Sequence, residues 1–378
     1  MDRGKEGVLY RKRVSLRGEV TMEIAIHAVA PQQRKTRPAD AGLVFGKVFT
    51  DHMFLMDFKT DGGWTNARIV PYGPLPLDPA AMVLHYGQGI FEGLKAYRCA
   101  DGRILFFRPL ENMKRFNRSA QRLCMPEVDI HFHLQAIETL VRLDADWVPR
   151  SKGASLYIRP TMIASEPHLG VRPATEYIHY VITGPVGAYY PEGFNPVKIY
   201  VTDEYVRAVR GGVGEAKTMA NYAASLRAQE VAKKKGYTQV LWLDAVERRY
   251  VEEVGTMNIF FLFKDELVTP PLSGSILPGV TRDSVIHLAK HWGLTVHERP
   301  IAIDEVVDAI ESGTMKEVFG TGTAAVISPV GQVCYKDKIY KVADGGVGEW
   351  SRRFYDEITA IQYGEKEDPF GWVYRLDI

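Results

Sequence analysis

Glycine and proline are concentrated in one short segment near the middle of the chain. Residues 184–196 contain three glycines and three prolines, the densest group of helix- and strand-breaking residues in this part of the sequence. Neither a helix nor a central strand is expected to continue through such a segment. A length of 378 residues also suits two domains better than one core. We therefore predict a linker at 184–196, domains at 41–183 and 197–378, and a partly flexible N-terminal extension at 1–40.

Composition and charge exclude several classes of protein. Hydrophobic residues make up 46% of the chain and charged residues 25%, which is typical of a folded globular protein. The 47 basic and 46 acidic residues leave a net charge of +1, so we expect neither a nucleic-acid partner nor a membrane partner. Residues 1–18 differ from the rest, because they carry six basic and two acidic side chains.

Cysteine use and the lack of long apolar runs indicate the compartment. Cys99, Cys124 and Cys334 are far apart and odd in number, which favours a reducing compartment over a disulfide framework. No apolar run reaches the ~18 residues of a membrane-spanning helix. The basic N-terminus lacks the apolar core of a signal peptide. We therefore predict a cytoplasmic protein.

The spacing of apolar residues predicts a mixture of helices and strands. Helical spacing follows Pro109, a residue suited to the first position of a helix, whereas runs rich in β-branched and aromatic residues predict strands. Because the two types do not alternate strictly, the predicted fold class is α+β, in two domains. We expect helices at 109–123, 133–147, 222–235, 281–292 and 348–362, strands at 44–58, 103–107, 156–164, 177–183, 197–202 and 317–319, and a hairpin-like pair of strands at 239–243 and 257–263.

Two loops are candidate anion sites. Residues 320–325, Gly-Thr-Gly-Thr-Ala-Ala, match the G-x-G-x-x-A pattern of dinucleotide-binding folds, but Pro329 interrupts the helix that such a fold requires. The same residues could instead form a cradle of backbone N–H groups or a simple tight turn. Residues 277–281, Leu-Pro-Gly-Val-Thr, predict a loop that leads directly into a helix. The N-terminus of that helix either binds a phosphate or is capped by Thr281 or Asp283.

Lys217 and Glu253 are the candidate chemical groups. Lys217 lies among small and apolar residues after the glycine-rich segment 211–214. Partial burial there would lower its pKa and make its amine a nucleophile, and the alternative is a solvated loop lysine. Glu253 precedes an apolar strand. It is either a charged residue of a hairpin or a residue that contacts a cofactor.

Other kinds of chemistry have little support. His287 and His291 are four residues apart on a predicted helix, but Leu288 stands where H-E-x-x-H has its glutamate and no cysteine is near. We therefore predict no metal site. The chain contains neither the G-x-S-x-G elbow of serine hydrolases nor a G-x-x-x-x-G-K-[ST] phosphate loop.

Several longer segments occur together and in a fixed order. They include Phe-Glu-Gly-Leu-Lys-Ala at 91–96, Leu-Tyr-Ile-Arg-Pro at 156–160, Gly-Gly-Val-Gly at 211–214 with Lys217, and Glu-Val-Gly-Thr-Met-Asn at 253–258. With these segments, residues 41–378 resemble the branched-chain amino acid aminotransferases of the fold-type IV pyridoxal-phosphate group. The resemblance implies a smaller N-terminal α/β domain, a larger C-terminal domain, and the cofactor pyridoxal 5'-phosphate between them.

The resemblance also implies roles for the residues at matching positions. Lys217 is the implied catalytic residue, which forms the Schiff base with the cofactor. Tyr222 is implied to hydrogen-bond the phenolic oxygen of the cofactor, and Glu253 to face its pyridine nitrogen. Further cofactor contacts, mainly at the phosphate, are implied for Arg108, Leu277, Val280, Thr281 and Thr323.

The implied substrate pocket is apolar and aromatic, with additional groups for carboxylates. The activity implied is a reversible ping-pong transfer of an amino group between L-leucine, L-isoleucine or L-valine and 2-oxoglutarate, in a homodimer or an oligomer of dimers. A D-amino acid aminotransferase and a 4-amino-4-deoxychorismate lyase of the same fold type are the alternatives. The resemblance places Phe45, Phe91, Tyr157, Val171 and Thr256 in the walls, Tyr86 from the neighbouring subunit, Arg159 beside Tyr86 or on the second carboxylate of glutamate, and the amides of Ala324 and Ala325 on the α-carboxylate.

Overall fold

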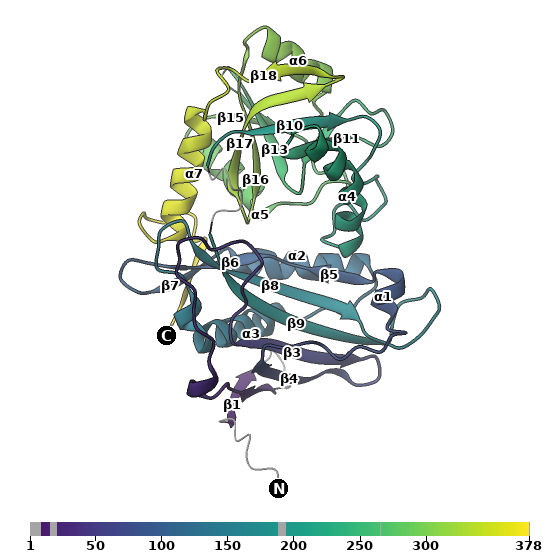
Figure 1. Cartoon of the computed structure of the whole chain (residues 1–378), viewed down its shortest axis with the longest axis vertical. Helices are drawn as coiled ribbons and strands as arrows, with labels where there is room; N and C mark the ends of the chain where they lie inside the picture. The colour runs from purple at the N-terminus through teal and green to yellow at the C-terminus, as the bar shows by residue number, and fades with distance from the viewer. Residues whose placement is uncertain (1–8, 16–20, 188–193, 265, 378) are drawn as a thin grey trace. The chain divides into compact units, whose positions relative to one another are not determined.

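The chain forms two compact units (Figure 1). The computed structural model describes residues 9–15, 21–187, 194–264 and 266–377. Unit 1 comprises residues 1–188 and 362–378, and unit 2 comprises residues 189–361. Each unit has its own sheet and its own hydrophobic core.

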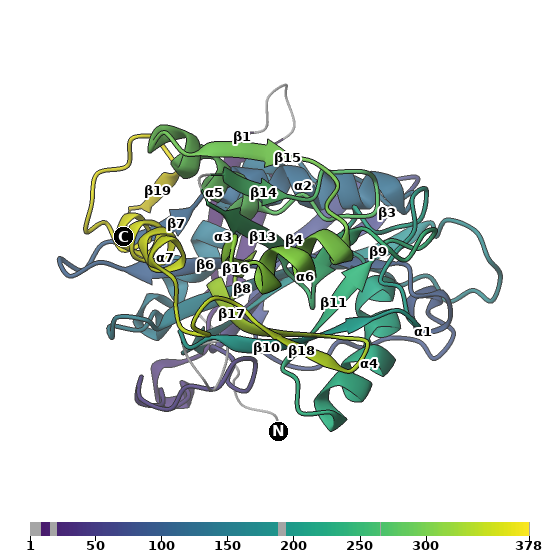
Figure 2. The ribbon, with the colours of Figure 1, turned by 90° about the horizontal axis from the view of Figure 1, so that it is seen from above.

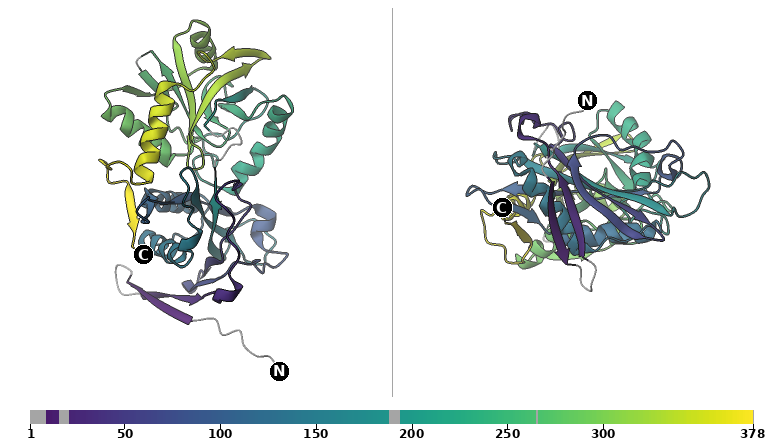
Figure 3. Two further views of the ribbon diagram at one scale, coloured as in Figure 1. Left: turned by 60° about the vertical axis from the view of Figure 1, so that its left-hand side comes forward. Right: turned by 90° about the horizontal axis from the view of Figure 1, so that it is seen from below.

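Unit 1 is built on a ten-stranded sheet. The strand order is β1-β2-β4-β3-β9-β8-β6-β7-β19, and β5 also pairs with β8. The pair β1 and β2 forms one edge of this sheet (Figure 3), and β2 runs parallel to β4, whereas the other described pairs are antiparallel. The elements are β1 (Leu9–Ser15), β2 (Thr21–His27), β3 (His52–Lys59), β4 (Gly63–Pro71), α1 (Met82–Tyr86), β5 (Gly89–Phe91), β6 (Leu94–Arg98), β7 (Ile104–Phe107), α2 (Pro109–Arg122), α3 (Ile130–Leu143), β8 (Ser155–Ala164), β9 (Glu176–Val186) and β19 (Val373–Leu376).

The alternation of side chains along β8 separates the core of unit 1 from the opposite face of the sheet. Leu156 and Ile158 are fully buried in one hydrophobic core with residues of α2 and α3, such as Phe116. Successive strand residues point to opposite faces, so Tyr157 and Arg159 lie on the face away from this core. That second face also carries the aromatic rings of Phe45 and Phe91.

Unit 2 is built on a nine-stranded mixed sheet. The strand order is β12-β11-β10-β17-β16-β13-β14-β15, and β18 also pairs with β17. β10 runs parallel to β11 and β17, and α4 lies beside β10 and β11 (Figure 2). The elements are β10 (Val197–Thr202), α4 (Met219–Lys234), β11 (Gln239–Leu243), β12 (Val251–Val254), β13 (Asn258–Phe263), β14 (Glu266–Thr269), α5 (Val280–His291), β15 (Thr295–Glu298), α6 (Ile303–Glu311), β16 (Met315–Gly322), β17 (Val326–Tyr335), β18 (Lys338–Lys341) and α7 (Glu349–Gln362).

The predicted helices are confirmed with small shifts of their ends, but two strand predictions are wrong, the start of the strand at 44–58 and the hairpin at 239–243 and 257–263. The strand predicted at 44–58 begins only at His52, because turns at 41–42 and 45–47 and irregular backbone precede it. Residues 239–243 and 257–263 do not form a hairpin, since β11 pairs with β10 and β12 while β13 pairs with β14 and β16. The strand predicted at 317–319 continues to Gly322, so two glycines of the motif lie within β16.

The limits of the two units also differ from the predicted domains. β9 continues through Gly184 and Pro185 in register with β8, and the division falls at 188–189, inside the predicted linker. Residues 362–378 belong to unit 1 because β19 pairs with β7, so the N-terminal unit is the longer one. β2 lies within the predicted extension at 1–40, yet its pairing with β4 makes it part of the sheet. Residues 188–193 of the predicted linker lie outside the described residues.

Within the described residues, no helix is both long enough and apolar enough to cross a membrane. Among the side chains that the structure describes, no three from His, Cys, Asp and Glu lie close enough together to hold a metal ion. Cys99 and Cys334 are buried free thiols, and Cys124 is an exposed one.

Two buried histidines in the core of unit 1 predict a stability that falls in acid. The rings of His133 and His179 lie 4.5 Å apart between centroids, and both side chains are buried. Burial lowers the pKa of His179 to about 4 and the pKa of His133 well below 6.5. Below about pH 6.5 the unfolded chain binds protons that the folded chain does not, so the free energy of unfolding decreases down to about pH 4. For His179 alone this pKa shift corresponds to about 3 kcal/mol.

We expect the His133→Leu variant to lose less stability than the wild type over this pH range. Neither ring nitrogen of His133 has a hydrogen-bond partner among the described residues, so leucine removes a titrating group without breaking a hydrogen bond. Urea unfolding at pH 7 and pH 4.5 measures the difference. The control is His131→Gln on the exposed side of the same helix, which should keep the wild-type pH dependence. An unchanged pH dependence in His133→Leu would contradict the prediction.

Candidate active site

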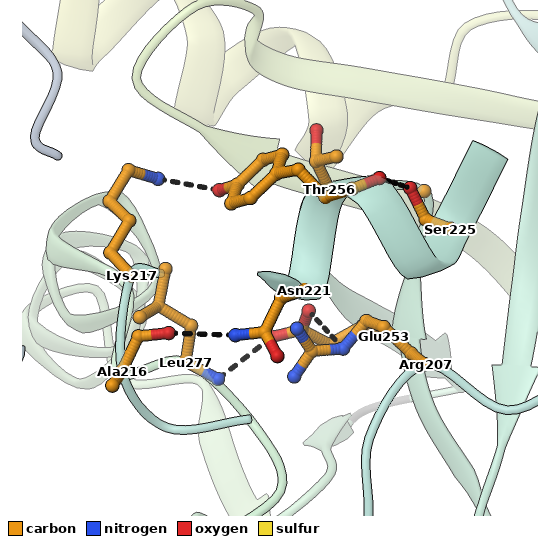
Figure 4. Close-up of a pocket in the computed structure, with 10 residues that line it drawn as sticks. Arg207, Ala216, Lys217, Asn221, Ser225, Glu253, Thr256 and Leu277 are labelled. Carbon is orange, nitrogen blue, oxygen red and sulfur yellow. Dashed lines mark hydrogen bonds and ion pairs between the residues drawn. The ribbon is translucent and has the colours of Figure 1, made fainter. Parts of the chain in front are cut away.

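Lys217 and Tyr222 meet in a pocket of unit 2 (Figure 4). Lys217 precedes α4, and its Nζ donates a hydrogen bond of 2.8 Å to the hydroxyl oxygen of Tyr222, in the first turns of that helix. The lining residues of the pocket are Arg207, Ala216, Lys217, Asn221, Tyr222, Ser225, Glu253, Gly255, Thr256 and Leu277.

Two kinds of contact fix the loop that carries Lys217. The Nδ2 of Asn221 donates hydrogen bonds of 2.8 Å to the carbonyl oxygens of Val213 and Ala216. Gly214 approaches the backbone of Ser275 so closely that any Cβ would overlap the Ser275 carbonyl group. The last glycine of the segment 211–214 is therefore required by close packing beside the lysine.

Glu253 brings a buried carboxylate to the same pocket. The residue is 2% exposed and lies in β12. Its Oε1 accepts hydrogen bonds from the Leu277 N–H at 3.0 Å and from Asn258 Nδ2 at 3.1 Å, and its Oε2 lies 3.0 Å from Nε of Arg207. Burial raises the pKa of Glu253, while the charge of Arg207 and the Leu277 N–H act in the opposite direction.

Arg207 and Asn258 are site residues to which the sequence patterns assign no role. The guanidinium of Arg207 pairs with Glu253 and also donates to the carbonyl oxygens of Gly214 and Ser275. Asn258 carries a partial signal in the sequence, because it ends the segment 253–258. Nothing in the sequence distinguishes Arg207 from other arginines, and only the fold shows that it faces a buried carboxylate.

Leu277, Val280 and Thr281 lie where a loop passes into α5. Gly279 is the N-cap of this helix, and no side chain caps it among the described residues, so capping by Thr281 or Asp283 is not observed. The N–H groups of a first helical turn point outward and carry the positive end of the helix dipole, which favours an anion. The N–H of Leu277 is bound to Glu253, as described above.

Thr323, Ala324 and Ala325 form the turn between β16 and β17. The preceding Gly320 packs against Met257, whose Cε would lie 2.8 Å from a Cβ at that position. This glycine therefore allows close packing within unit 2. Because a strand follows the turn instead of a helix, a dinucleotide-binding site at residues 320–325 is excluded.

Four of the predicted substrate-binding residues gather on the second face of the unit 1 sheet. The rings of Phe45 and Tyr157 lie 4.8 Å apart between centroids in an edge-to-face arrangement. Arg159 donates a hydrogen bond of 2.8 Å from Nη2 to the Tyr157 hydroxyl, and its guanidinium lies 4.5 Å from the centre of the Phe91 ring. Gly93 makes room for this arrangement, because a Cβ there would overlap the Tyr157 hydroxyl.

Three other predicted residues of unit 1 lie on other elements. Tyr86 on α1 is 40% exposed, and Val171, in the loop between β8 and β9, is 87% exposed. Arg108 is the N-cap of α2 and has a left-handed backbone with φ of 49°. Its N–H donates to the Trp372 carbonyl oxygen at 2.7 Å, and its guanidinium lies 5.2 Å from the centre of the Trp372 ring. The C-terminal segment therefore holds Arg108 in place.

Comparison with known proteins identifies the class and then the group within it. The model of the amino-transferase class IV family matches residues 89–333. The chain therefore belongs to the class IV aminotransferases and, within them, to the branched-chain-amino-acid aminotransferases. It is 56% identical over 339 residues to branched-chain-amino-acid aminotransferase 2 of Bacillus subtilis, covering 90% of this chain and 93% of that one. It is 51% identical over 352 residues to a probable branched-chain-amino-acid aminotransferase of Staphylococcus aureus, covering 93% and 98%.

Solved structures show the same fold. The branched-chain amino acid aminotransferase of Escherichia coli has a TM-score of 0.73 and 28% identity, with 86% of this chain and 99% of that chain covered. The T.th. branched-chain amino acid aminotransferase in complex with N-(5'-phosphopyridoxyl)-L-glutamate has a TM-score of 0.70 and 27% identity, covering 86% and 98%. The predicted fold class, a two-domain α+β fold of type IV, is confirmed.

Removal of the cation beside Glu253 should destabilise the protein. In Arg207→Met the buried carboxylate loses its ion pair, and we expect the free energy of unfolding to fall by about 3–5 kcal/mol, as when one member of a buried pair is removed. Urea unfolding at pH 7 measures the loss. Lys235→Met is the control, since it removes an exposed ion pair with Asp337 and should change stability little. Equally small losses of unfolding free energy in both variants would show that the buried ion pair does not stabilise the protein.

Proposed function

We propose that this protein transfers an amino group between L-leucine, L-isoleucine or L-valine and 2-oxoglutarate, with pyridoxal 5'-phosphate as its cofactor. The observation that carries the proposal is the contact between the Lys217 amine and the Tyr222 hydroxyl in the pocket that also holds the pair of Glu253 and Arg207. The high identity to named branched-chain-amino-acid aminotransferases supports this choice of substrates.

The donor groups of the pocket fit this cofactor chemically. An amine suits the aldehyde, a phenol suits the phenolic oxygen, and a carboxylate suits the ring nitrogen, and we assign these roles to Lys217, Tyr222 and Glu253. When bound, the cofactor serves as an electron sink for the substrate carbon that loses its proton. For the phosphate we propose Arg108, the N-terminus of α5 at Val280 and Thr281, and Thr323, with Leu277 as a further contact.

Lys217 is proposed to move the proton of the reaction. Its amine would take the proton from the α-carbon of the amino acid as a general base and would then deliver it, as a general acid, to the carbon of the cofactor's former aldehyde group. The Tyr222 hydroxyl, 2.8 Å from Nζ, orients the amine for both steps. Glu253 serves in its charged form, which Arg207 and two N–H donors stabilise against the effect of burial.

We propose that the second face of the unit 1 sheet provides the walls for the substrate side chain. Phe45, Phe91 and Tyr157 suit the branched apolar side chains, and Arg159 suits the second carboxylate of glutamate and 2-oxoglutarate. The other proposed contacts are the walls Thr256 and Val171, the amides of Ala324 and Ala325 on the α-carboxylate, and Tyr86 of the neighbouring subunit.

The exposure of Tyr86 and Val171 in a single chain supports an assembly in which a second copy covers them. We therefore propose a homodimer, or a higher oligomer built from dimers, that acts on small molecules in the cytoplasm. No nucleic-acid or membrane partner is part of this proposal.

Lys217→Ala should abolish both turnover and the covalent attachment of the cofactor, because it removes the only amine that lines the described pocket. The visible absorbance of the purified variant, before and after borohydride reduction, measures attachment, and an assay with L-leucine and 2-oxoglutarate measures turnover. The control is Lys235→Met, which replaces an exposed lysine at the C-cap of α4 and should behave as the wild type. Turnover retained in Lys217→Ala would overturn the proposed mechanism.

The substrates themselves provide an independent prediction. With 2-oxoglutarate as acceptor, we expect the kcat/KM values for L-leucine, L-isoleucine and L-valine to differ by no more than about 200-fold. The reason is that one methylene in an apolar pocket contributes only about 1–3 kcal/mol. D-alanine should give no measurable turnover. Turnover of D-alanine without turnover of L-leucine would instead support a D-amino acid aminotransferase.

A further inference from the structure

Asn258, the first residue of β13, connects two parts of the candidate site. Its side chain is buried, and its Nδ2 donates hydrogen bonds to Oε1 of Glu253 at 3.1 Å and to the carbonyl oxygen of Leu277 at 2.9 Å. The N–H of Leu277 donates to the same Oε1 at 3.0 Å. The carboxylate, the asparagine amide and the backbone of Leu277 therefore form a closed set of hydrogen bonds, in which none of the three can turn without breaking a contact.

The other end of the Asn258 amide reaches the N-terminus of α5. Its Oδ1 points at Gly279, the N-cap of this helix, and a Cβ on Gly279 would overlap that oxygen. The backbone of Gly279 has φ of −72° and ψ of 132°, a conformation open to any residue. Glycine is therefore needed at this position for space, and the atom that occupies the space belongs to Asn258.

We propose that Asn258 is a positioning residue that fixes the spacing between the Glu253 carboxylate and the N-terminus of α5. This inference rests on the proposed function, in which Glu253 faces the ring nitrogen of pyridoxal 5'-phosphate and Val280 and Thr281 face its phosphate. With Asn258 in place, the groups proposed to hold the two ends of the cofactor would keep one fixed separation before it binds. Such preorganisation strengthens binding because the groups lose little freedom when the ligand arrives.

The chemistry of the amide explains why asparagine suits this position. Its NH₂ group supplies two donors, one for the carboxylate and one for a carbonyl oxygen, whereas an aspartate would place a negative oxygen against both acceptors. Asn258→Asp should therefore be worse than Asn258→Ala, although its shape is nearly the same as that of the wild type.

Release of the cofactor from the holoenzyme tests the proposal. We expect pyridoxal 5'-phosphate to leave Asn258→Ala at least tenfold faster than the wild type after dilution, and to leave Asn258→Asp faster still, followed by the visible absorbance of the protein. Thr269→Val is the matched control. It removes a buried hydrogen bond of 2.7 Å to the Ile259 carbonyl oxygen on the neighbouring strand, so it should lower the unfolding temperature and leave the release rate unchanged.

Gly279→Ala tests the same contact without removing the asparagine. Alone, the new methyl group displaces Oδ1 of Asn258 and should speed release. Combined with Asn258→Ala, it no longer meets Oδ1 or Cγ of Asn258, and of its three nearest atoms only the Cβ of Arg282, at 3.2 Å, remains, so it should add little. The double variant should therefore release the cofactor about as fast as Asn258→Ala. Release of the cofactor from Asn258→Ala at the wild-type rate would overturn the proposal. So would a double variant that releases the cofactor faster by the product of the two single-variant factors.

The same preparations separate this inference from the proposed function. If the wild-type holoenzyme does not turn over L-leucine with 2-oxoglutarate, the proposed function fails, whatever the release rates are. If L-leucine is turned over and the release rates do not follow the expected order, only the role of Asn258 is overturned.

Discussion

The buried charge of Glu253 is the constraint on which the site in unit 2 depends. A carboxylate that is 2% exposed is stable in its charged form only when a cation and hydrogen-bond donors replace water. Arg207, Leu277 and Asn258 do so from three separate segments. Arg207 also holds the backbone of Gly214, close to Lys217 in the sequence. The contacts that stabilise the carboxylate thus also position the loop of the catalytic candidate.

The second face of the unit 1 sheet shows how an apolar wall can carry a positive charge. Arg159 lies against the rings of Phe91 and Tyr157, and it has no carboxylate partner among the described residues. Aromatic faces attract a guanidinium without neutralising it. The proposed substrates need both properties, because the branched-chain amino acids have apolar side chains whereas 2-oxoglutarate has a second carboxylate. Gly93 is necessary for this arrangement, since any side chain would displace Tyr157.

The sequence predicts the local elements and the family well, and the long-range pairings poorly. Pro109 and the apolar spacing after it indicate the start of α2 correctly, because helix signals are local. The pairing of β19 with β7 joins residues more than 260 positions apart, and no local signal marks it. Gly184 and Pro185 predict a break in the chain, but they extend β9. Lys217, Tyr222 and Glu253 do lie in one pocket, whereas Arg207 is recognised only from its contact with a buried carboxylate.

The C-terminal segment 362–378, which belongs to unit 1, supports Arg108, the proposed phosphate contact. This residue adopts a left-handed backbone, which costs a side-chain-bearing residue about 1 kcal/mol or more and persists only where neighbouring contacts enforce it. Trp372 provides such contacts, because its carbonyl oxygen accepts the Arg108 N–H and its ring lies against the guanidinium. Trp372 is held close to β19, which pairs with β7 directly before Arg108. The C-terminal segment thus fixes the conformation of Arg108, which lies 264 residues before Trp372 in the sequence. A truncation before Trp372 would leave unit 2 intact in sequence but remove the support of this arginine.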